Sequence, residues 1–162
     1  MASLLHDVGK IGVPHTILRK PGRLTDAEFA IVKQHVVLGE VLIREIPSLE
    51  EVRSAVVSHH ERWDGGGYPH GLRGESIPLL GRIIAVADAY SAMTSDRPYR
   101  KSLSPEEAVA ELRQCAGTQF DPQLVELFVA GLTLRTERTP SVEAPASSAS
   151  DRCLARVGNN DT

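Results

Sequence analysis

Two groups of adjacent ionisable residues stand out in this chain of 162 residues. The first is His6-Asp7, with Lys10 close behind, and the second opens the stretch 59–69, whose sequence is HHERWDGGGYP. Imidazole and carboxylate groups are ligands that bind zinc, iron and manganese in proteins. Because bound metals of this kind activate water against phosphate esters, the two groups together indicate metal-dependent hydrolysis of a phosphate ester.

Two further residues with metal-binding chemistry lie within predicted helices. Asp88 sits in the most apolar segment of the chain, 77–89, where an unpartnered carboxylate is too costly to keep ionised. A metal ion would satisfy it, and so would a salt bridge to an arginine such as Arg82 or a helix N-cap. His35 lies at the edge of the apolar face of a predicted helix over 26–45, where a satisfied core histidine is the alternative interpretation.

These candidates share an inward-facing or helix-terminal position, and no disulfide or other structural feature explains why ionisable residues occur there. A joint interpretation as metal ligands is therefore stronger than any single one. His15 and His70 occur in loop contexts, and we expect both to lie on the surface. The predicted metal ligands are His6, Asp7, His35, His59, His60 and Asp88.

Two segments could hold the rest of a phosphate-containing ligand. The glycines at 65–67 permit backbone conformations closed to other residues and let a ligand approach closely. Tyr68 could stack on a base or donate to a phosphate, and a tight loop with Tyr68 packed on the core is the alternative. The run 96–101 (DRPYRK) supplies three cations, of which Arg97 could bind phosphate bidentately. A solvated charged face is the alternative for that run.

Helix signals of good quality surround these residues. In the apolar run 77–89, alanine and aspartate favour a buried central helix over a buried strand. The other predicted helices follow capping boxes at 25–28, 48–51 and 104–107, the last stopping near Gly117, and the Asp121-Pro122 pair. The sequence therefore predicts an all-α fold.

Length and composition limit the class of protein. An apolar content of 41% and a charged content of 24% are those of one ordinary globular domain. The formal net charge of −3 argues against a nucleic-acid polymer as partner. Cys115 and Cys153 cannot build a disulfide framework, and we expect Cys115 to be a small buried hydrophobe. No run is apolar enough for a membrane span and no signal peptide precedes the domain, so the cytoplasm is the expected location.

The composition changes near Arg135. Residues 139–150 are rich in proline, serine and alanine and carry no periodic apolar face. We therefore predict one domain over 1–134 and a disordered tail over 135–162.

Taken together, these residues resemble the HD-GYP family, a branch of the HD-domain metal-dependent phosphohydrolases. Residues 6–10 (HDVGK) match its HDxGK signature, and residues 59–72 (HHERWDGGGYPHGL) match its longer HHExxDGxGYPxGL signature at every defining position. Asp88 stands where the family has a helix-borne aspartate, and residues 96–99 (DRPY) resemble its downstream turn.

The resemblance implies a helical bundle of the HD-domain type around two or three divalent metal ions, often iron or manganese. The implied reaction is hydrolysis of cyclic di-GMP to linear pGpG or to GMP. The six predicted ligands fall on the family's ligand positions, with Asp7 as the bridging carboxylate and with Asp7 and Lys10 as catalytic residues. A diguanylate cyclase domain of the GGDEF type and a second copy of the chain, in a dimer, are implied partners. The implied substrate-binding residues are Lys10, Gly67, Tyr68, Arg97 and Arg100.

The chain also departs from the family pattern. In the family, a helix before HDxGK supplies a further metal-binding histidine, and this chain starts too late to contain it. We therefore expect an N-terminally truncated domain whose first metal site, made by His6, Asp7 and Asp88, lacks a ligand. Two alternatives to an active phosphodiesterase stay open. One is a non-catalytic module of the same family that binds a cyclic dinucleotide or a protein, and the other is an HD phosphohydrolase of another nucleotide.

Overall fold

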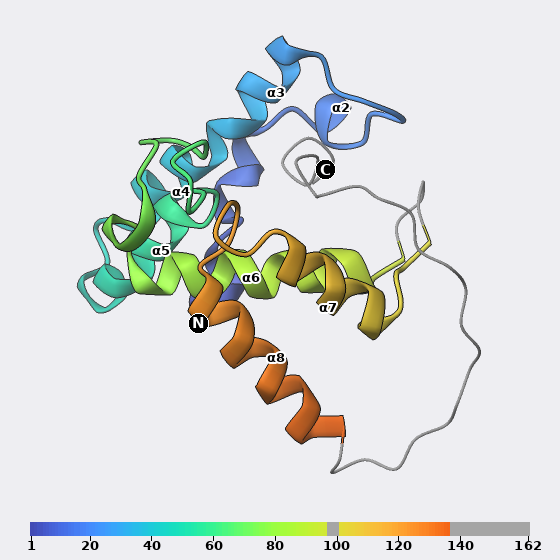
Figure 1. Cartoon of the computed structure of the whole chain (residues 1–162). Coiled ribbons are helices and arrows are strands. Elements are labelled where there is room, and N and C mark those ends of the chain that lie inside the picture. The colour runs from blue at the N-terminus through green and yellow to red at the C-terminus, as the bar shows by residue number, and fades with distance from the viewer. Residues whose placement is uncertain (97–100, 137–162) are drawn as a thin grey trace.

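The computed structural model describes residues 1–96 and 101–136, and within these ranges the chain is helical and contains no β-strand. The predicted all-α fold is therefore confirmed. The described α-helices are α1 (Ala2–Leu5), α2 (His15–Leu18), α3 (Asp26–Lys33), α4 (His35–Ile43), α5 (Glu50–Ser58), α6 (Leu79–Thr94), α7 (Pro105–Gln114) and α8 (Pro122–Thr136) (Figure 1). Short 3-10 helices are η1 (Val8–Gly12), η2 (Pro47–Leu49) and η3 (Gly74–Ser76). None of the helices in the described ranges is long and apolar enough to span a bilayer.

Some predictions fall outside these ranges. The predicted substrate-binding residues Arg97 and Arg100 both lie outside the described residues. The same is true of the predicted tail over 135–162, apart from its first two residues. Arg135 and Thr136 belong to α8, so this helix continues past the predicted end of the domain.

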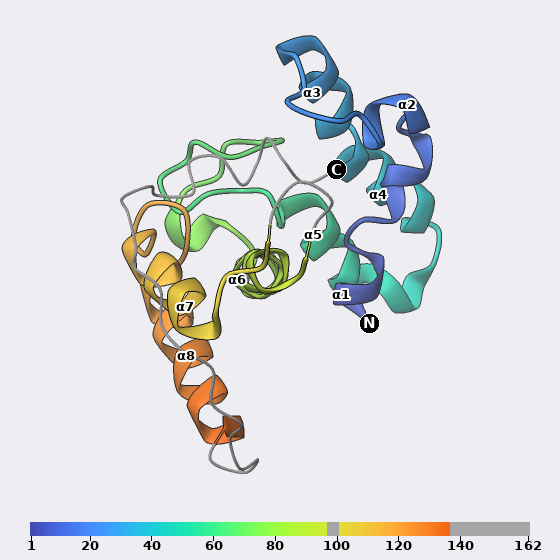
Figure 2. The same ribbon diagram turned by 90° about the vertical axis from the view of Figure 1, so that its right-hand side faces the viewer.

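Helix α6 runs through the middle of the described structure. Figure 2 shows it end-on, with α1, α4 and α5 on one side and α7 and α8 on the other. Its buried residues include Ile84, Ala89 and Met93. The predicted buried helix is thus confirmed over much of its length, although Leu79 is 54% exposed and Ile83 is 41% exposed.

Two apolar cores flank α6. The larger one joins α6 to α7 and α8 and contains Met93 and Leu112. Cys115 is buried in the same core, which confirms the prediction of a small buried hydrophobe. The second core joins α1, η1, α4 and α5 around Ile43 and Val56. The predicted metal ligands come from the elements on this second side, together with α6.

Two of the three predicted capping boxes are confirmed. Thr25 and Ser104 cap α3 and α7, and each exchanges hydrogen bonds with the glutamate three residues later. The box predicted at Ser48 is wrong, because Pro47–Leu49 forms η2 and α5 begins at Glu50 without a side-chain cap. A capping residue needs an extended backbone, and Ser48 instead lies inside a 3-10 turn.

The single helix predicted over 26–45 is two helices, α3 and α4, separated at Gln34. At the break, the His35 Nδ1 atom lies 2.7 Å from the carbonyl oxygen of Val32. His35 is the first residue of α4, and its ring is buried.

Candidate metal centre

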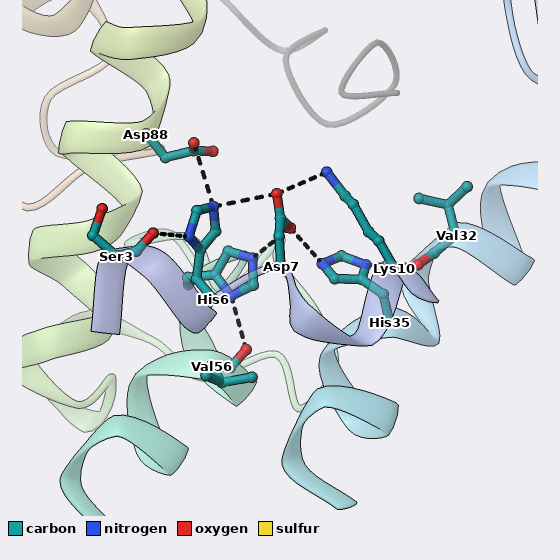
Figure 3. Close-up of polar contacts among 9 residues, drawn as sticks. Ser3, His6, Asp7, Lys10, Val32, His35, Val56 and Asp88 are labelled. Carbon is teal, nitrogen blue, oxygen red and sulfur yellow. Dashed lines mark hydrogen bonds and ion pairs between the residues drawn. The ribbon is translucent and has the colours of Figure 1, made fainter. Parts of the chain in front are cut away.

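Three histidines are oriented in the same way. Each stands at or just after the end of a helix, and its Nδ1 atom contacts the backbone carbonyl oxygen three residues earlier (Figure 3). Since a carbonyl can only accept, Nδ1 carries a proton in each ring, and wherever the ring is neutral Nε2 keeps its lone pair. The pairs are His6 with Ser3 at 2.8 Å, His35 with Val32 at 2.7 Å and His59 with Val56 at 2.8 Å.

The Nε2 atoms of His35 and His59 are buried and have no hydrogen-bond partner among the described residues, whereas that of His6 faces Asp7 Oδ2 at 3.3 Å and Asp88 Oδ1 at 3.5 Å. Buried polar atoms are normally satisfied, and each exception calls for an explanation. A metal ion would supply the missing partner, because metal-bound histidines typically donate their other ring nitrogen to a backbone carbonyl or carboxylate. The satisfied core histidine considered for His35 therefore does not describe it, since only one of its two ring nitrogens is satisfied.

Asp7 lies between the histidines and directs its two oxygens to different neighbours (Figure 3). Its Oδ1 atom is 3.4 Å from His35 Nε2 and 3.9 Å from His59 Nε2. Its Oδ2 atom is 3.3 Å from His6 Nε2 and 3.0 Å from Lys10 Nζ. One carboxylate therefore touches two groups of potential ligands.

These contacts define two ligand groups that share Asp7. In the first, single ligand atoms of Asp7, His35, His59 and His60 all lie within 4.8 Å of one another. In the second, His6 Nε2 stands between Asp7 and Asp88, with Asp88 Oδ1 at 3.5 Å. Two atoms that bind one ion at about 2.1 Å lie roughly 3 to 4 Å apart. The separations of 3.3 to 3.9 Å between the carboxylate oxygens and the Nε2 atoms of His6, His35 and His59 fit this range.

Asp88 has neither of the two partners other than a metal that its sequence position allowed. Arg82 is paired with Asp121 at 2.7 Å, so it is not the partner of Asp88. Asp88 lies within α6, far from its N-cap at Pro78, and its side chain is 32% exposed, less buried than the sequence suggested. Its contact in the described structure is His6.

Close packing of η1 on α4 brings Asp7 to His35. Gly9 is buried in η1, and a Cβ atom there would overlap the carbonyl oxygen of His35 and lie 2.5 Å from Gly39 N. Gly9 does not end the preceding helix, because α1 ends at Leu5; it serves the close contact instead.

The two ligand groups differ in their electrostatics. Hydrogen bonds to Asp7 and Asp88 raise the pKa of His6 to about 10, so this ring is protonated near neutral pH and a metal must displace the proton. Burial favours the protonated form of Asp7, but the hydrogen bond from His6 and the charge of Lys10 hold its pKa well below the usual range. Burial lowers the pKa of the other histidines, to about 4 for His59, so they are neutral at physiological pH, which is the form that binds metal. Burial also lowers the pKa of His35 and of His60.

The glycine-rich loop is held against the centre by Glu61, which the sequence reasoning did not assign to the site. Glu61 is only 3% exposed, and its two oxygens accept the backbone N–H groups of His70 at 2.7 Å and Leu72 at 3.0 Å. The sequence feature that could have indicated this role is the position of a carboxylate directly before a glycine-rich loop, whose backbone N–H groups need acceptors. His70 and His15 are exposed, as predicted.

Two predicted substrate-binding residues of this loop, Gly67 and Tyr68, lie among the described residues. The ring of Tyr68 stacks on His60, with centroids 4.9 Å apart and planes at 25°. At Gly67, a Cβ atom would lie 2.5 Å from the Cα of Glu61 and 2.6 Å from the carbonyl oxygen of His60. The absence of a side chain at Gly67 is thus explained by the chain's own backbone, and a substrate contact there stays a prediction.

Known proteins share both the sequence and the fold. The family model described as HD domain matches residues 1–124. A cyclic di-GMP phosphodiesterase of Thermotoga maritima is 48% identical over 130 residues, which cover 79% of this chain and 35% of that protein. The 3'3'-cGAMP-specific phosphodiesterase 2 of Vibrio cholerae is 45% identical over 130 residues, which cover 79% of this chain and 25% of that protein.

A solved structure agrees at the level of the fold. The crystal structure of a cyclic GMP-AMP-specific phosphodiesterase of V. cholerae superposes with a TM-score of 0.57 at 22% identity, covering 85% of this chain and 39% of that one. The chain spans about a third or a quarter of the length of the two curated relatives. Since the family model covers most of the chain and both signature motifs lie in the cluster, this chain belongs to the HD domain family, in its HD-GYP branch.

Proposed function

We propose that the protein is a metal-dependent phosphodiesterase that hydrolyses cyclic di-GMP to linear pGpG or to GMP. The observation that supports this best is Asp7, whose two oxygens face two different ligand groups. The buried Nε2 atoms of His35 and His59, which lack a hydrogen-bond partner within the described residues, support it independently. The names of the relatives, as cyclic dinucleotide phosphodiesterases, suggest the class of substrate.

We propose two or three divalent ions at the centre, of iron or manganese. The group of Asp7, His35, His59 and His60 would hold one ion, and the group of His6, Asp7 and Asp88 would hold another. Nitrogen and oxygen ligands without thiolates suit iron and manganese. When bound, such ions supply a hydroxide from water near neutral pH and neutralise charge on the phosphate.

The chain's own residues would orient the reacting groups. Asp7, as the bridging carboxylate, would fix the separation of the two ligand groups. The Nδ1 hydrogen bonds of the histidines would keep their lone pairs directed inward. Lys10, whose Nζ atom lies 3.0 Å from Asp7 Oδ2, would donate to a phosphate oxygen and stabilise the charge that develops as the phosphodiester bond breaks.

We propose that the remaining predicted residues contact the rest of the substrate. Tyr68, stacked on His60, would lie beside the nucleoside next to the scissile phosphate. Gly67 would allow that nucleoside to approach the loop. Arg97 and Arg100, outside the described residues, would bind phosphate through their guanidinium groups.

A second substrate is favoured by one comparison. The relative named as specific for 3'3'-cGAMP is nearly as similar to this chain as the one named for cyclic di-GMP. Both compounds are cyclic dinucleotides with two phosphodiester bonds, so the same metal chemistry would serve either. A diguanylate cyclase domain as partner and a dimeric state follow from the family resemblance alone, and the cytoplasmic location follows from the sequence pattern alone. All three stay predictions.

Product analysis tests the proposal. The purified chain is incubated anaerobically with Mn²⁺ or Fe²⁺ and with cyclic di-GMP or 3'3'-cGAMP in separate reactions, and products are separated by chromatography. We expect pGpG or GMP from cyclic di-GMP, and none from the Asp7→Asn variant. Arg113→Ala serves as the control, since Arg113 pairs with Glu126 between α7 and α8. Hydrolysis of neither compound, or undiminished hydrolysis by Asp7→Asn, would refute it.

A further inference from the structure

A cationic and aromatic cluster lies beside the metal centre and includes residues without an assigned role. It consists of Phe29 and Lys33 from α3 and Tyr68 from the glycine-rich loop. Phe29 and Lys33 are four residues apart and so share one face of α3. Lys33 Nζ lies 4.7 Å from the ring centroid of Phe29 and 5.2 Å from that of Tyr68. The two rings meet edge to face at 6.1 Å, so three side chains hold one another in place.

Two connections tie this cluster to the metal centre. Tyr68 stacks on His60 at 4.9 Å, and His60 belongs to the first ligand group. Lys33 is also the last residue of α3, and His35 opens α4 directly after the turn at Gln34. The ammonium of Lys33 therefore lies one aromatic ring away from a predicted metal ligand, which is within the reach of one bound dinucleotide.

Lys33 differs from the neighbouring lysines in its charge environment. Lys10 pairs with Asp7 at 3.0 Å and Lys20 pairs with Glu28 at 2.6 Å. In the part of the chain that the structure describes, no carboxylate forms an ion pair with Lys33, which is half-buried against the two rings. A cation held by aromatic faces and lacking a counter-charge is well suited to bind an anion.

We propose that Lys33 binds the second, non-reacting phosphate of a cyclic dinucleotide whose first phosphate lies at the metal centre. This inference rests on the proposed function. A cyclic dinucleotide carries two phosphates, and the metal centre with Lys10 would neutralise the reacting one. The second phosphate needs a cation at some distance from the metal ligands. Lys33 provides this cation, and Phe29 and Tyr68 restrict the movement of its side chain. Lys33 would thus favour cyclic dinucleotides over compounds with a single phosphodiester.

The test compares two substrates in the whole chain. Lys33→Ala should raise the KM for cyclic di-GMP about tenfold while kcat changes by less than about twofold. Hydrolysis of bis(p-nitrophenyl) phosphate, which has one phosphodiester, should be unchanged. Lys33→Arg should restore most of the affinity because it keeps the charge. Arg113→Ala removes the same charge away from the centre and should leave both substrates unaffected, and metal content should match the wild type in all variants.

The outcomes separate this inference from the proposed function. An unchanged KM in Lys33→Ala, in a chain that hydrolyses cyclic di-GMP, would overturn the role of Lys33 alone. An equal loss on both substrates would also overturn it, because the effect would then reside at the metal centre. A wild-type chain that hydrolyses no cyclic dinucleotide would overturn the proposed function itself. If Lys33→Ala lowers thermal stability, Lys33→Gln, which keeps the length of the side chain, is measured in its place.

Discussion

Replacing Gly9 by alanine should separate the two elements that bring Asp7 to His35. Gly9 lies where η1 crosses α4, and the added Cβ atom would overlap the carbonyl oxygen of His35. It would also lie 2.5 Å from Gly39 N and 2.8 Å from the carbonyl carbon of His35. All of these atoms belong to the backbone, so no change of rotamer relieves the overlap and η1 must move away from α4.

The size of the effect follows from this geometry. Overpacking by one methyl group typically costs about 1–3 kcal/mol, and a contact with rigid backbone should fall near the upper end. For a chain whose total stability is about 5–15 kcal/mol, that lowers the melting temperature by roughly 10 °C. The same movement lengthens the 3.4 Å separation of Asp7 Oδ1 and His35 Nε2, so metal affinity should fall about tenfold or more.

Urea unfolding of the metal-free chain and titration with Mn²⁺ measure the two effects. Gly131→Ala is the matched control, because Gly131 is exposed in α8 and, apart from its chain neighbours and the backbone of its own helix, no atom of the described residues lies within 4 Å of the added Cβ. That substitution should stabilise the chain by about 0.5–1 kcal/mol. If Gly9→Ala unfolds at the wild-type urea concentration and binds Mn²⁺ as tightly as the wild type, the close contact of η1 and α4 does not position Asp7.

Three further changes examine the centre and its loop. Asp7→Asn keeps the shape of the side chain but removes its charge, so metal content by mass spectrometry should fall to background. Lys10→Ala should retain metal and lower kcat about a hundredfold. Equal metal content in Asp7→Asn and the wild type would contradict the bridging role. Because hydrogen bonds to Asp7 and Asp88 raise the pKa of His6 to about 10, its ring is protonated below that value, and metal must displace the proton. Calorimetry in several buffers should therefore show proton release and an affinity that rises from about pH 7 to pH 10, and a constant affinity would argue against His6 as a ligand. Glu61→Gln replaces one acceptor oxygen by an amide donor facing a backbone N–H, so stability in urea should fall by about 1–3 kcal/mol, and wild-type stability would show that the carboxylate does not hold the loop.

Much of the centre could be predicted because its residue types conflict with their surroundings. His59 and His60 end a helix of apolar periodicity, and Asp88 interrupts an apolar segment. Such residues need partners, and the sequence offered few besides one another. The competing salt bridge of Asp88 to Arg82 could be rejected only once the pairing of Arg82 with Asp121 was known, since those two residues are far apart in sequence.

The features that the sequence did not reveal depend on contacts between a side chain and the backbone. The bond of the His35 ring to the carbonyl of Val32 lies at the break at Gln34, and helix periodicity carries no sign of either. The role of Glu61 depends on a loop that returns to it nine and eleven residues later. Lys33 had the pattern of a solvated lysine at the end of a helix, and its position over Tyr68 requires the loop to fold back onto α3.

The central claim is a metal centre bridged by Asp7 that hydrolyses a cyclic dinucleotide. It is tested most directly by measuring metal content and cyclic di-GMP hydrolysis on one anaerobic preparation supplied with manganese or ferrous iron. We expect about two ions per chain, with release of pGpG or GMP. Bound metal without product would contradict the enzymatic role and leave a binding module, and a chain that binds no metal would contradict the centre itself.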